Sequence, residues 1–268
     1  MFGGLANNPI IIGTWGLYAW SREEPTKVLR HAYESGFRRF DTAAVYGGGN
    51  AELDISTLPR DIEIHTKIPS MTKNKKVTFK EAYPIKYVNA TLRDIRNRLG
   101  THQINVLYLH NWDVNWNRSK NIGEITRICK DRSKKIGISL PSDYNLFMEE
   151  PSIDLISEYF DVVQLPYCAS ANKNGSLIRR LLDRGLTINL RSVLVHGLLI
   201  KNDEELEKGN PSLLRYSNNE RRQLRGDTEK QNIRERVKYC IDSALSVGPV
   251  GVILGVTKSE HINDLKNG

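Results

Sequence analysis

The chain has 268 residues, of which 39% are hydrophobic and 26% are charged. With this length and hydrophobic content the chain can bury one large core, since barrel domains run to about 250 residues. The formal net charge of +8 is compatible with a phosphorylated cofactor, a nucleic acid or an anionic lipid surface. Because the basic residues are dispersed along the chain, we expect them to form a solvated surface.

The sequence carries no signal that would divide the chain or send it to a membrane. It lacks a linker rich in proline, glycine or serine, so we expect residues 1–268 to form a single domain. The start of the chain is too short and polar for a signal peptide, and no apolar run approaches membrane-spanning length. The three cysteines form no CxxC pair, which is typical of a reduced protein without a thiol metal site. We expect a soluble cytoplasmic protein without a metal; its oligomeric state is left open.

Short apolar runs recur along the whole chain, and each is bounded by glycine or by polar residues. We expect strands at Ile10–Gly13, Phe37–Asp41, Ile62–Thr66, Ile104–Leu109, Lys135–Ser139, Asp161–Tyr167, Leu186–Val193 and Val250–Gly255. Segments with apolar residues at helical spacing predict helices at Glu24–Ser35, Ala51–Leu58, Pro84–Leu99, Ile122–Lys130 and Ile233–Leu245. The polar stretch Lys201–Asp227 is typical of an irregular surface excursion.

Four side chains with acid–base chemistry stand at or just beyond three successive strand-like runs. Asp41 ends the second run and Tyr46 follows it, while Lys67 and His110 follow the next two runs. In a barrel of parallel strands these ends converge on one face, where active sites of that architecture lie. Taken singly, they admit structural readings: an ion pair, a loop aromatic and a strand-end residue. Together they favour a catalytic site.

These motifs resemble a known family. Asp41-Thr42-Ala43 with Tyr46-Gly47, Thr66-Lys67 and Leu109-His110 are similar, in order and spacing, to the four catalytic signatures of the aldo-keto reductases. The resemblance implies an α/β fold, a (β/α)8 TIM barrel. It also implies reduction of a small carbonyl substrate (an aldehyde, ketone or keto-sugar) to an alcohol. The implied cofactor is NADPH, with NADH as the alternative.

The resemblance also implies where the cofactor binds. The implied positions are Gly13, Thr14, Trp15, Asp41, Ser139, Gln164 and Arg191 near the nicotinamide, Ser192, Leu194 and Gly197 along the pyrophosphate, and Gly255, Thr257, Lys258, His261 and Asp264 around the adenosine. A short helix after the eighth strand is a recurring phosphate-binding device of barrels. Because Lys258 is the only basic residue between Gly255 and Glu260, we expect a modest preference for NADPH.

The chain departs from the family pattern at three places. The second helix, Ala51–Leu58, is shortened by Pro59. Leu140 stands where the family usually has Asn, so we expect one contact to the nicotinamide amide to be missing. The sequence stops at Gly268, which predicts that the usual C-terminal lid segment is absent.

The expected mechanism assigns one role to each of the four residues. Tyr46 is the general acid, and the Lys67 ammonium lowers the pKa of that phenol from its usual value near 10. Asp41 keeps Lys67 charged and oriented, and His110 binds the substrate oxygen. Arg191, which strand parity turns toward the barrel mouth, either lies against the nicotinamide or pairs with an acidic loop residue.

Side-chain alternation extends this expectation into the barrel interior. The residues that share an inward face with the catalytic groups are Arg39 and Phe37, His65 and Glu63, and Tyr108 and Val106. Since buried charges need partners, Arg39 and Glu63 are the predicted ion pair. His65 is then a satisfied interior histidine rather than a catalyst.

Two other classes of function stay open at this stage. One is a regulatory module that keeps the fold and the cofactor, since some members of the family that resemble this chain serve as ion-channel accessory subunits. A stable tetramer or a large exposed apolar patch would favour it. The other is a nucleic-acid-binding protein, whose affinity would collapse with salt. We expect no nucleic-acid partner.

Overall fold

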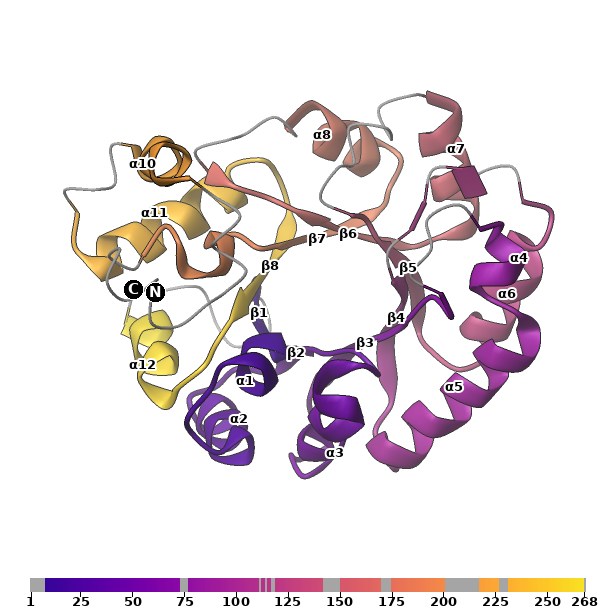
Figure 1. The fold of residues 1–268 in the computed structure, drawn as a ribbon, viewed down its shortest axis with the longest axis horizontal. Helices are drawn as coiled ribbons and strands as arrows, with labels where there is room; N and C mark the ends of the chain where they lie inside the picture. Colours follow the sequence, from indigo (N-terminus) through magenta and orange to yellow (C-terminus); the bar gives the residue numbers. More distant parts are fainter. Residues whose placement is uncertain are drawn as a thin grey trace.

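The computed structural model describes residues 8–72, 77–110, 112–113, 115–116, 119–141, 150–169, 175–200, 217–226 and 231–267. Within these residues, eight parallel strands close into a barrel in chain order (Figure 1). The strands are β1 (Ile10–Gly13), β2 (Arg39–Asp41), β3 (Glu63–Ile68), β4 (Ile104–His110), β5 (Lys135–Ser139), β6 (Val162–Pro166), β7 (Thr187–Arg191) and β8 (Val250–Gly255). The predicted (β/α)8 TIM barrel is confirmed.

Helices surround the barrel and connect successive strands. They are α1 (Trp15–Ala19), α2 (Pro25–Glu34), α3 (Asn50–Ser56), α4 (Phe79–Ala82), α5 (Ile85–Leu99), α6 (Ile122–Lys130), α7 (Glu150–Tyr159), α8 (Gly175–Asp183), α10 (Asn218–Arg225), α11 (Ile233–Leu245) and α12 (Ser259–Asn267). Two 3₁₀ turns follow β2 and β7, at Tyr46–Gly49 and Val195–Gly197. The helix between β2 and β3, α3, is short, as the sequence predicts.

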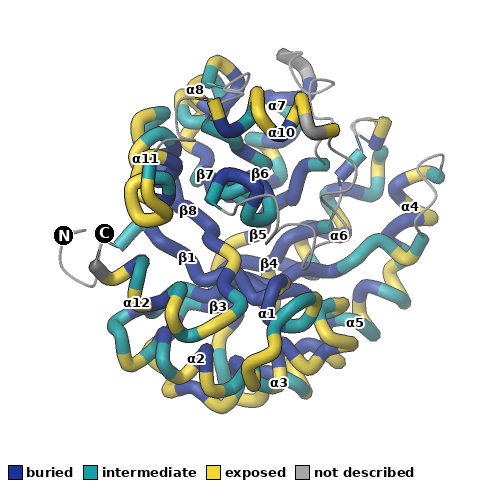
Figure 2. Tube along the Cα trace, turned by 60° about the vertical axis from the view of Figure 1, so that its left-hand side comes forward, coloured by how far each residue is buried: buried dark blue, intermediate teal, exposed yellow. Residues whose placement is uncertain are grey.

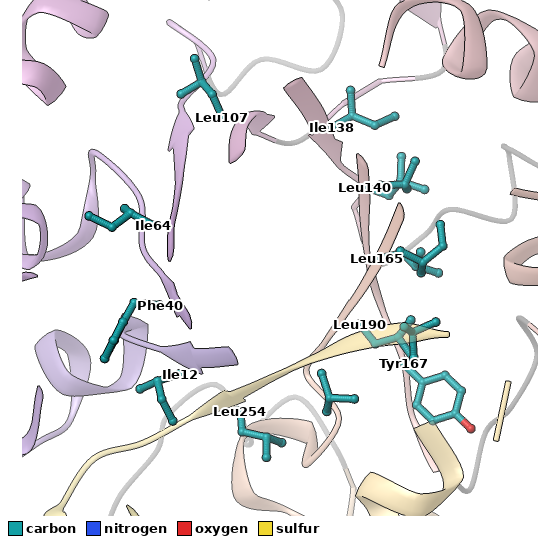
Figure 3. Close-up of a cluster of buried hydrophobic side chains, with 14 of the residues drawn as sticks. Ile12, Phe40, Ile64, Leu107, Ile138, Leu140, Leu165, Tyr167, Leu190 and Leu254 are labelled. Carbon is teal, nitrogen blue, oxygen red and sulfur yellow. The ribbon is translucent and has the colours of Figure 1, made fainter. Parts of the chain in front are cut away.

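The main hydrophobic core lies between the outer face of the barrel and the helices. Each strand contributes an apolar side chain to the cluster in Figure 3, where they stand on the outer side of the barrel wall. These residues are Ile12, Phe40, Ile64, Leu107, Ile138, Leu165, Leu190 and Leu254, each 0–1% exposed. Along the chain the strands are mostly buried, whereas the helices alternate between buried and exposed positions (Figure 2). Burial of this outer layer, rather than the barrel interior, supplies most of the apolar contact.

The barrel interior is largely polar, because the strands alternate and their other face points inward. The predicted pair of Arg39 and Glu63 is confirmed, with Nε and Oε2 3.5 Å apart at the amino-terminal ends of β2 and β3. Glu63 also accepts a hydrogen bond of 2.7 Å from Nε2 of the fully buried His65. Burial lowers the pKa of His65. His65 is therefore a neutral interior histidine whose Nε2–H is paired, although its buried Nδ1 has no hydrogen-bond partner among the described residues.

A second polar pair crosses the barrel above this one. The Asn189 amide donates a hydrogen bond of 2.7 Å to the Tyr108 hydroxyl. Two glycines make room for it: a Cβ at Gly137 would stand 2.7 Å from the Tyr108 ring, and one at Gly251 would stand 2.2 Å from the Asn189 side-chain oxygen. Larger residues at these glycines would displace the pair that fills the barrel below the site.

Two expectations from the sequence are wrong. Phe37 does not enter the barrel; it belongs to the outer cluster, because β2 begins only at Arg39 and the alternation does not extend back to it. The stretch expected to be irregular contains α10, which begins with a capping box between Ser217 and Glu220. Arg225, at its end, is 4% exposed and donates to the carbonyl of Leu198. Residues 201–216 and 227 lie outside the described residues.

Candidate active site

The centre of the candidate site is an ion pair between Asp41 at the end of β2 and Lys67 in β3. Lys67 Nζ lies 2.6 Å from Asp41 Oδ1 and donates a second hydrogen bond of 2.7 Å to the carbonyl of Thr42. Both side chains are almost completely buried, with 1% exposure for Lys67 and 6% for Asp41. A buried charge pair with further hydrogen bonds holds its geometry tightly, because separating the charges leaves each one uncompensated. The Lys67 side chain is thereby fixed in position at the barrel mouth.

The far side of the barrel completes the hydrogen bonding of Asp41. Gln164 in β6 donates its side-chain amide to Asp41 Oδ2 over 2.8 Å, and its oxygen accepts a 3.0 Å hydrogen bond from Ser139 in β5. Thr14, after β1, donates through both its backbone N–H and its hydroxyl to the carbonyl of Asp41. The predicted cofactor residues Thr14, Ser139 and Gln164 thus form one buried network with the ion pair.

Tyr46 lies beside Lys67, in the 3₁₀ turn that follows β2. Lys67 Nζ is 5.3 Å from the centroid of the Tyr46 ring. Burial raises the pKa of Tyr46 above its usual value; Lys67 is the strongest influence that lowers it, and Arg191 acts in the same direction. We expected Lys67 to bring this pKa below its usual value. Instead, the loss of solvent around the phenol outweighs the ammonium, and the net shift is upward.

His110, at the end of β4, faces the same space. Its ring is 6.5 Å from that of Tyr46, centroid to centroid, at an interplanar angle of 81°. Burial lowers the pKa of His110 to about 3, and the positive charges of Lys67 and Arg191 contribute in the same direction. The backbone carbonyl of His110 accepts a hydrogen bond of 2.6 Å from Tyr83, which anchors the strand end. His110 is therefore a neutral imidazole near pH 7.

Arg191, the last residue of β7, extends to the carboxyl end of β5. It donates to the carbonyl of Leu140 over 2.8 Å and to the hydroxyl of Ser192 over 3.2 Å. The prediction that Arg191 turns toward the barrel mouth agrees with its electrostatic effect on Tyr46 and His110. Its guanidinium is a fixed positive charge at the site.

The loop after β7 has a strained backbone. Ser192, Val195 and His196 have φ of 59°, 47° and 57°, a region that non-glycine residues rarely adopt. Such strain persists only where surrounding structure imposes it, and it gathers at ligand-binding segments. Here Trp15 packs edge-on against the His196 ring, with centroids 5.2 Å apart. The loops after β1 and β7 therefore meet at the mouth.

The segment after β8, expected to hold the adenosine, is engaged by residues of this chain. The Thr257 backbone N–H donates to Nδ1 of His261 over 3.3 Å, and Lys258 pairs with Glu260. Glu23 accepts hydrogen bonds from the backbone N–H and hydroxyl of Ser259, the first residue of α12. The start of α12, where we expected a phosphate of the cofactor to bind, is thus hydrogen-bonded to the carboxylate of Glu23.

The remaining predicted residues are spread along the rim. Asp264 pairs with Arg234 of α11 at 3.3 Å, at the exposed end of this segment. Gly13 and Gly255 are paired in register at the ends of β1 and β8, while Leu194 and Gly197 lie in the strained loop. The structure therefore brings Asp41, Tyr46, Lys67 and His110 together with Ser139, Gln164 and Arg191. Of the predicted adenosine positions, Gly255 lies next to Gly13 at the mouth, and the others follow it in the segment after β8.

Sequence reasoning missed several residues that shape the site: Tyr18, Trp20, Glu23, Glu52, Arg98 and Arg234. Glu52 is fully buried and bonded to Thr66 and Arg98, and Tyr18 is bonded to Asp54. The nearest signal in the sequence was that Glu52 lies in the first turn of the helix directly after the glycine-rich turn. Their partners come from other elements, so spacing along the chain does not reveal them.

Among the described residues, no group of three His, Cys, Asp or Glu side chains is placed to hold a metal ion. None of the helices that the structure describes is long and apolar enough to cross a membrane.

Comparison with known proteins then decides the family. Residues 9–267 match the model of the Aldo/keto reductase family. The chain belongs to this family. A curated relative, "Probable aldo-keto reductase 1" from Glycine max, is 28% identical over 123 residues. That match covers 44% of this chain and 35% of the relative, so the chain aligns with only about a third of that protein's length.

Solved structures of aldo-keto reductases share the fold. The reductase AKR11C1 from Bacillus halodurans, in its holo form, superposes with a TM-score of 0.72 at 18% identity and covers 97% of this chain and 85% of that one. The glycerol dehydrogenase AKR11B4 from Gluconobacter oxydans has a TM-score of 0.70 at 17% identity, with the same coverages. A Klebsiella pneumoniae aldo/keto reductase in complex with NADP and acetate has a TM-score of 0.63 at 15% identity, covering 97% and 84%.

The residues at the mouth fit the nicotinamide end of the family's cofactor. Gly255 is exposed, and a Cβ there would meet nothing within 4 Å, so the rim is bare beside the end of β1. The Gln164 amide uses one N–H on Asp41 and one lone pair on Ser139, which leaves a donor and an acceptor for a carboxamide. Ser139, Gln164 and Asp41 would hold the nicotinamide there.

Proposed function

We propose that this protein is an NAD(P)H-dependent reductase that converts the carbonyl of an aldehyde, ketone or keto-sugar to an alcohol. The observation that carries the proposal is the convergence of Tyr46, His110 and the Asp41–Lys67 pair at the barrel mouth. Membership of the aldo/keto reductase family supports the same chemistry.

Each side chain has a role that follows from its surroundings. The nicotinamide, when bound, supplies the hydride. Tyr46 donates its phenolic proton to the carbonyl oxygen as negative charge develops there. Because burial raises the pKa of Tyr46, the phenol is fully protonated at neutral pH, and Lys67 stabilises the phenolate that remains after transfer. A positioned acid of this kind contributes roughly 10² to 10⁴ in rate.

The other groups bind and orient. His110, with a pKa of about 3, is neutral and offers a hydrogen bond to the carbonyl oxygen without acting as a proton source. Asp41 keeps the Lys67 ammonium aimed at the phenol, and Gln164 fixes Asp41 from across the barrel. The proton therefore comes from Tyr46, and the charge that it leaves behind is met by Lys67.

For the cofactor we propose NADPH, with a modest preference over NADH that comes from Lys258. The Lys258 ammonium is paired with Glu260, and the Glu23 carboxylate accepts a hydrogen bond from the backbone N–H of Ser259. Both carboxylates repel the extra phosphate that NADPH carries on its adenosine ribose, so the preference for NADPH over NADH is small.

The test is a fluorescence titration with NADPH and NADH, followed by a panel of aldehydes, ketones and keto-sugars. We expect both cofactors to bind and at least one carbonyl class to be reduced. Cofactor binding without turnover of any carbonyl would contradict the proposal and favour a regulatory module.

A further inference from the structure

The turn that carries Tyr46 consists mostly of glycine. Gly47, Gly48 and Gly49 follow the tyrosine directly and have φ of 56°, 66° and 101°. Glycine adopts such angles without steric cost, but it also has the largest conformational freedom to lose. Backbone hydrogen bonds hold part of the turn, from the Gly48 N–H to the Val45 carbonyl and from the Asn50 N–H to the Tyr46 and Gly47 carbonyls. Three successive glycines add no side-chain contacts of their own, so side chains from elsewhere must supply the rest.

Tyr18 of α1 supplies the first contact. Its ring lies so close over the turn that a Cβ at Gly47 would stand 2.5 Å from the ring carbon Cδ1. The Tyr18 hydroxyl donates to Oδ2 of Asp54 and lies 3.5 Å from the carbonyl of Asn50, both in α3. The ring is thus pinned between the turn and the helix that follows it.

Arg98 of α5 supplies the second contact, from another side. A Cβ at Gly49 would stand 2.9 Å from Cδ and 3.0 Å from Nε of Arg98. Arg98 Nε donates to Oε2 of Glu52 over 2.7 Å, and Glu52 Oε1 accepts from the hydroxyl of Thr66. Since Thr66 directly precedes Lys67 in β3, this bond connects the tyrosine turn to the strand of the lysine.

Glu52 is the buried link of this arrangement. It is 0% exposed; burial raises its pKa, while Thr66 and Arg98 lower it. A carboxyl group held away from water needs both donors, since each unpaired buried acceptor costs free energy. Its two bonds therefore keep Thr66 and Arg98 at fixed places on either side of it.

We propose that Tyr18, Arg98 and Glu52 form a clamp on the glycine turn and are positioning residues that hold the Tyr46 phenol beside the Lys67 ammonium. None of the three touches the reacting atoms in this role. The proposal rests on the proposed function, in which Tyr46 is the proton donor. Misplacing a catalytic group by about 1 Å costs up to about 100-fold in rate, so a loosened turn lowers kcat.

The test uses variants that change no charge, so that any effect on Tyr46 reports position. Tyr18→Phe removes only the hydroxyl that pins the ring to Asp54. Tyr33→Phe is the matched control, because Tyr33 also donates to an aspartate, Asp61, over 2.9 Å, but on the exposed face of α2. Arg98→Lys is the second variant; it keeps a cation for Glu52 and loses the planar group that covers Gly49.

Two readouts separate positioning from simple loss of stability. Steady-state kinetics should show kcat of Tyr18→Phe lowered about tenfold, with KM and cofactor Kd within about twofold and Tyr33→Phe unchanged. Titration of tyrosine labelled with ¹³C at Cζ, with the Tyr46 resonance assigned from Tyr46→Phe, reads the phenol without turnover. Its pKa should shift in Tyr18→Phe and Arg98→Lys, because burial raises it and Lys67 lowers it, and both influences depend on where the phenol lies.

The outcomes are distinct. A fall in kcat together with a shifted Tyr46 pKa, in Tyr18→Phe but not in Tyr33→Phe, supports the clamp. An unchanged Tyr46 pKa in both Tyr18→Phe and Arg98→Lys overturns it, even if both variants melt earlier. If the wild-type protein reduces no carbonyl, the proposed function fails, and the Tyr46 titration alone still decides whether the clamp exists.

Discussion

Gln164 donates a hydrogen bond of 2.8 Å to Asp41, although the two residues belong to β6 and β2, which lie on opposite sides of the closed barrel. The bond joins the carboxylate that holds Lys67 to the part of the rim where the nicotinamide is expected. A change on one side of the barrel is therefore felt at the ion pair on the other side.

The first prediction tests this connection. Gln164→Met keeps the length of the side chain but leaves Asp41 Oδ2 and the Ser139 hydroxyl without their partner. The free energy of unfolding should fall by about 1–3 kcal/mol, the cost of unpaired buried polar groups. Urea denaturation measures it, with Gln223→Met on the exposed face of α10 as the control. An equal loss in both variants would show that the bond contributes nothing.

The second prediction concerns acid stability. His110 has a folded pKa of about 3, below the usual 6.5, so between these values the unfolded chain binds a proton that the folded protein does not. Stability is therefore present above pH 6.5 and is lost as the pH falls toward 3. The share from His110 amounts to about 2 kcal/mol between pH 7 and pH 5. Urea denaturation at pH 7 and pH 5 measures the fall in the free energy of unfolding between the two values. This fall should be smaller by that amount in His110→Asn than in the wild type, and equal falls in both proteins would contradict the prediction.

The third prediction concerns cofactor choice. Lys258→Ala should abolish the modest preference for NADPH. Glu23→Gln should strengthen it, because the carboxylate that holds the Ser259 amide also repels a phosphate. Fluorescence titration gives the dissociation constants of both cofactors. Glu24→Gln is the control, since its carboxylate bonds Thr26 and Lys27 instead. If the ratio of the two dissociation constants changes equally in Glu23→Gln and Glu24→Gln, the effect comes from net charge and not from the position of Glu23.

The fourth prediction concerns Arg191. A fixed positive charge at the mouth should disfavour the oxidised nicotinamide, which is itself positively charged, relative to the reduced one. Arg191→Tyr should therefore tighten the oxidised cofactor more than the reduced one, whereas Arg191→Lys, which keeps the charge, should not. If titration shows that the two redox states shift equally in Arg191→Tyr, the guanidinium does not act on the nicotinamide.

Much of the fold could be predicted from the sequence because its elements carry local signals. The bounds of β5, β8, α6 and α11 agree with those predicted, since apolar runs and helical spacing mark them directly. α7 and α8 were not predicted. The apolar side chains of α8, including Leu177 and Leu181, are buried in the folded protein, and this burial arises from packing on the barrel. Tertiary packing rather than local pattern places such helices.

The site divides in the same way. Strand parity predicted the Arg39–Glu63 pair, because neighbouring strands bring these positions together. The convergence of strand ends and the family resemblance predicted the meeting of Lys67 with Asp41. The sign of the Tyr46 shift could not be predicted, since it depends on how completely loops exclude water. The clamp on the glycine turn depends on contacts between α1, α3 and α5, which leave no regular spacing in the sequence.

The central claim is that Tyr46 donates the proton to the carbonyl oxygen. The most direct measurement compares wild type and Tyr46→Phe in single-turnover reduction of a carbonyl that the wild type reduces, together with the Kd of the reduced cofactor. The phenol serves the substrate, whereas other residues hold the cofactor. We predict that the rate falls by at least about 100-fold while the Kd changes by less than about twofold. An unchanged rate of reduction in Tyr46→Phe would contradict the account.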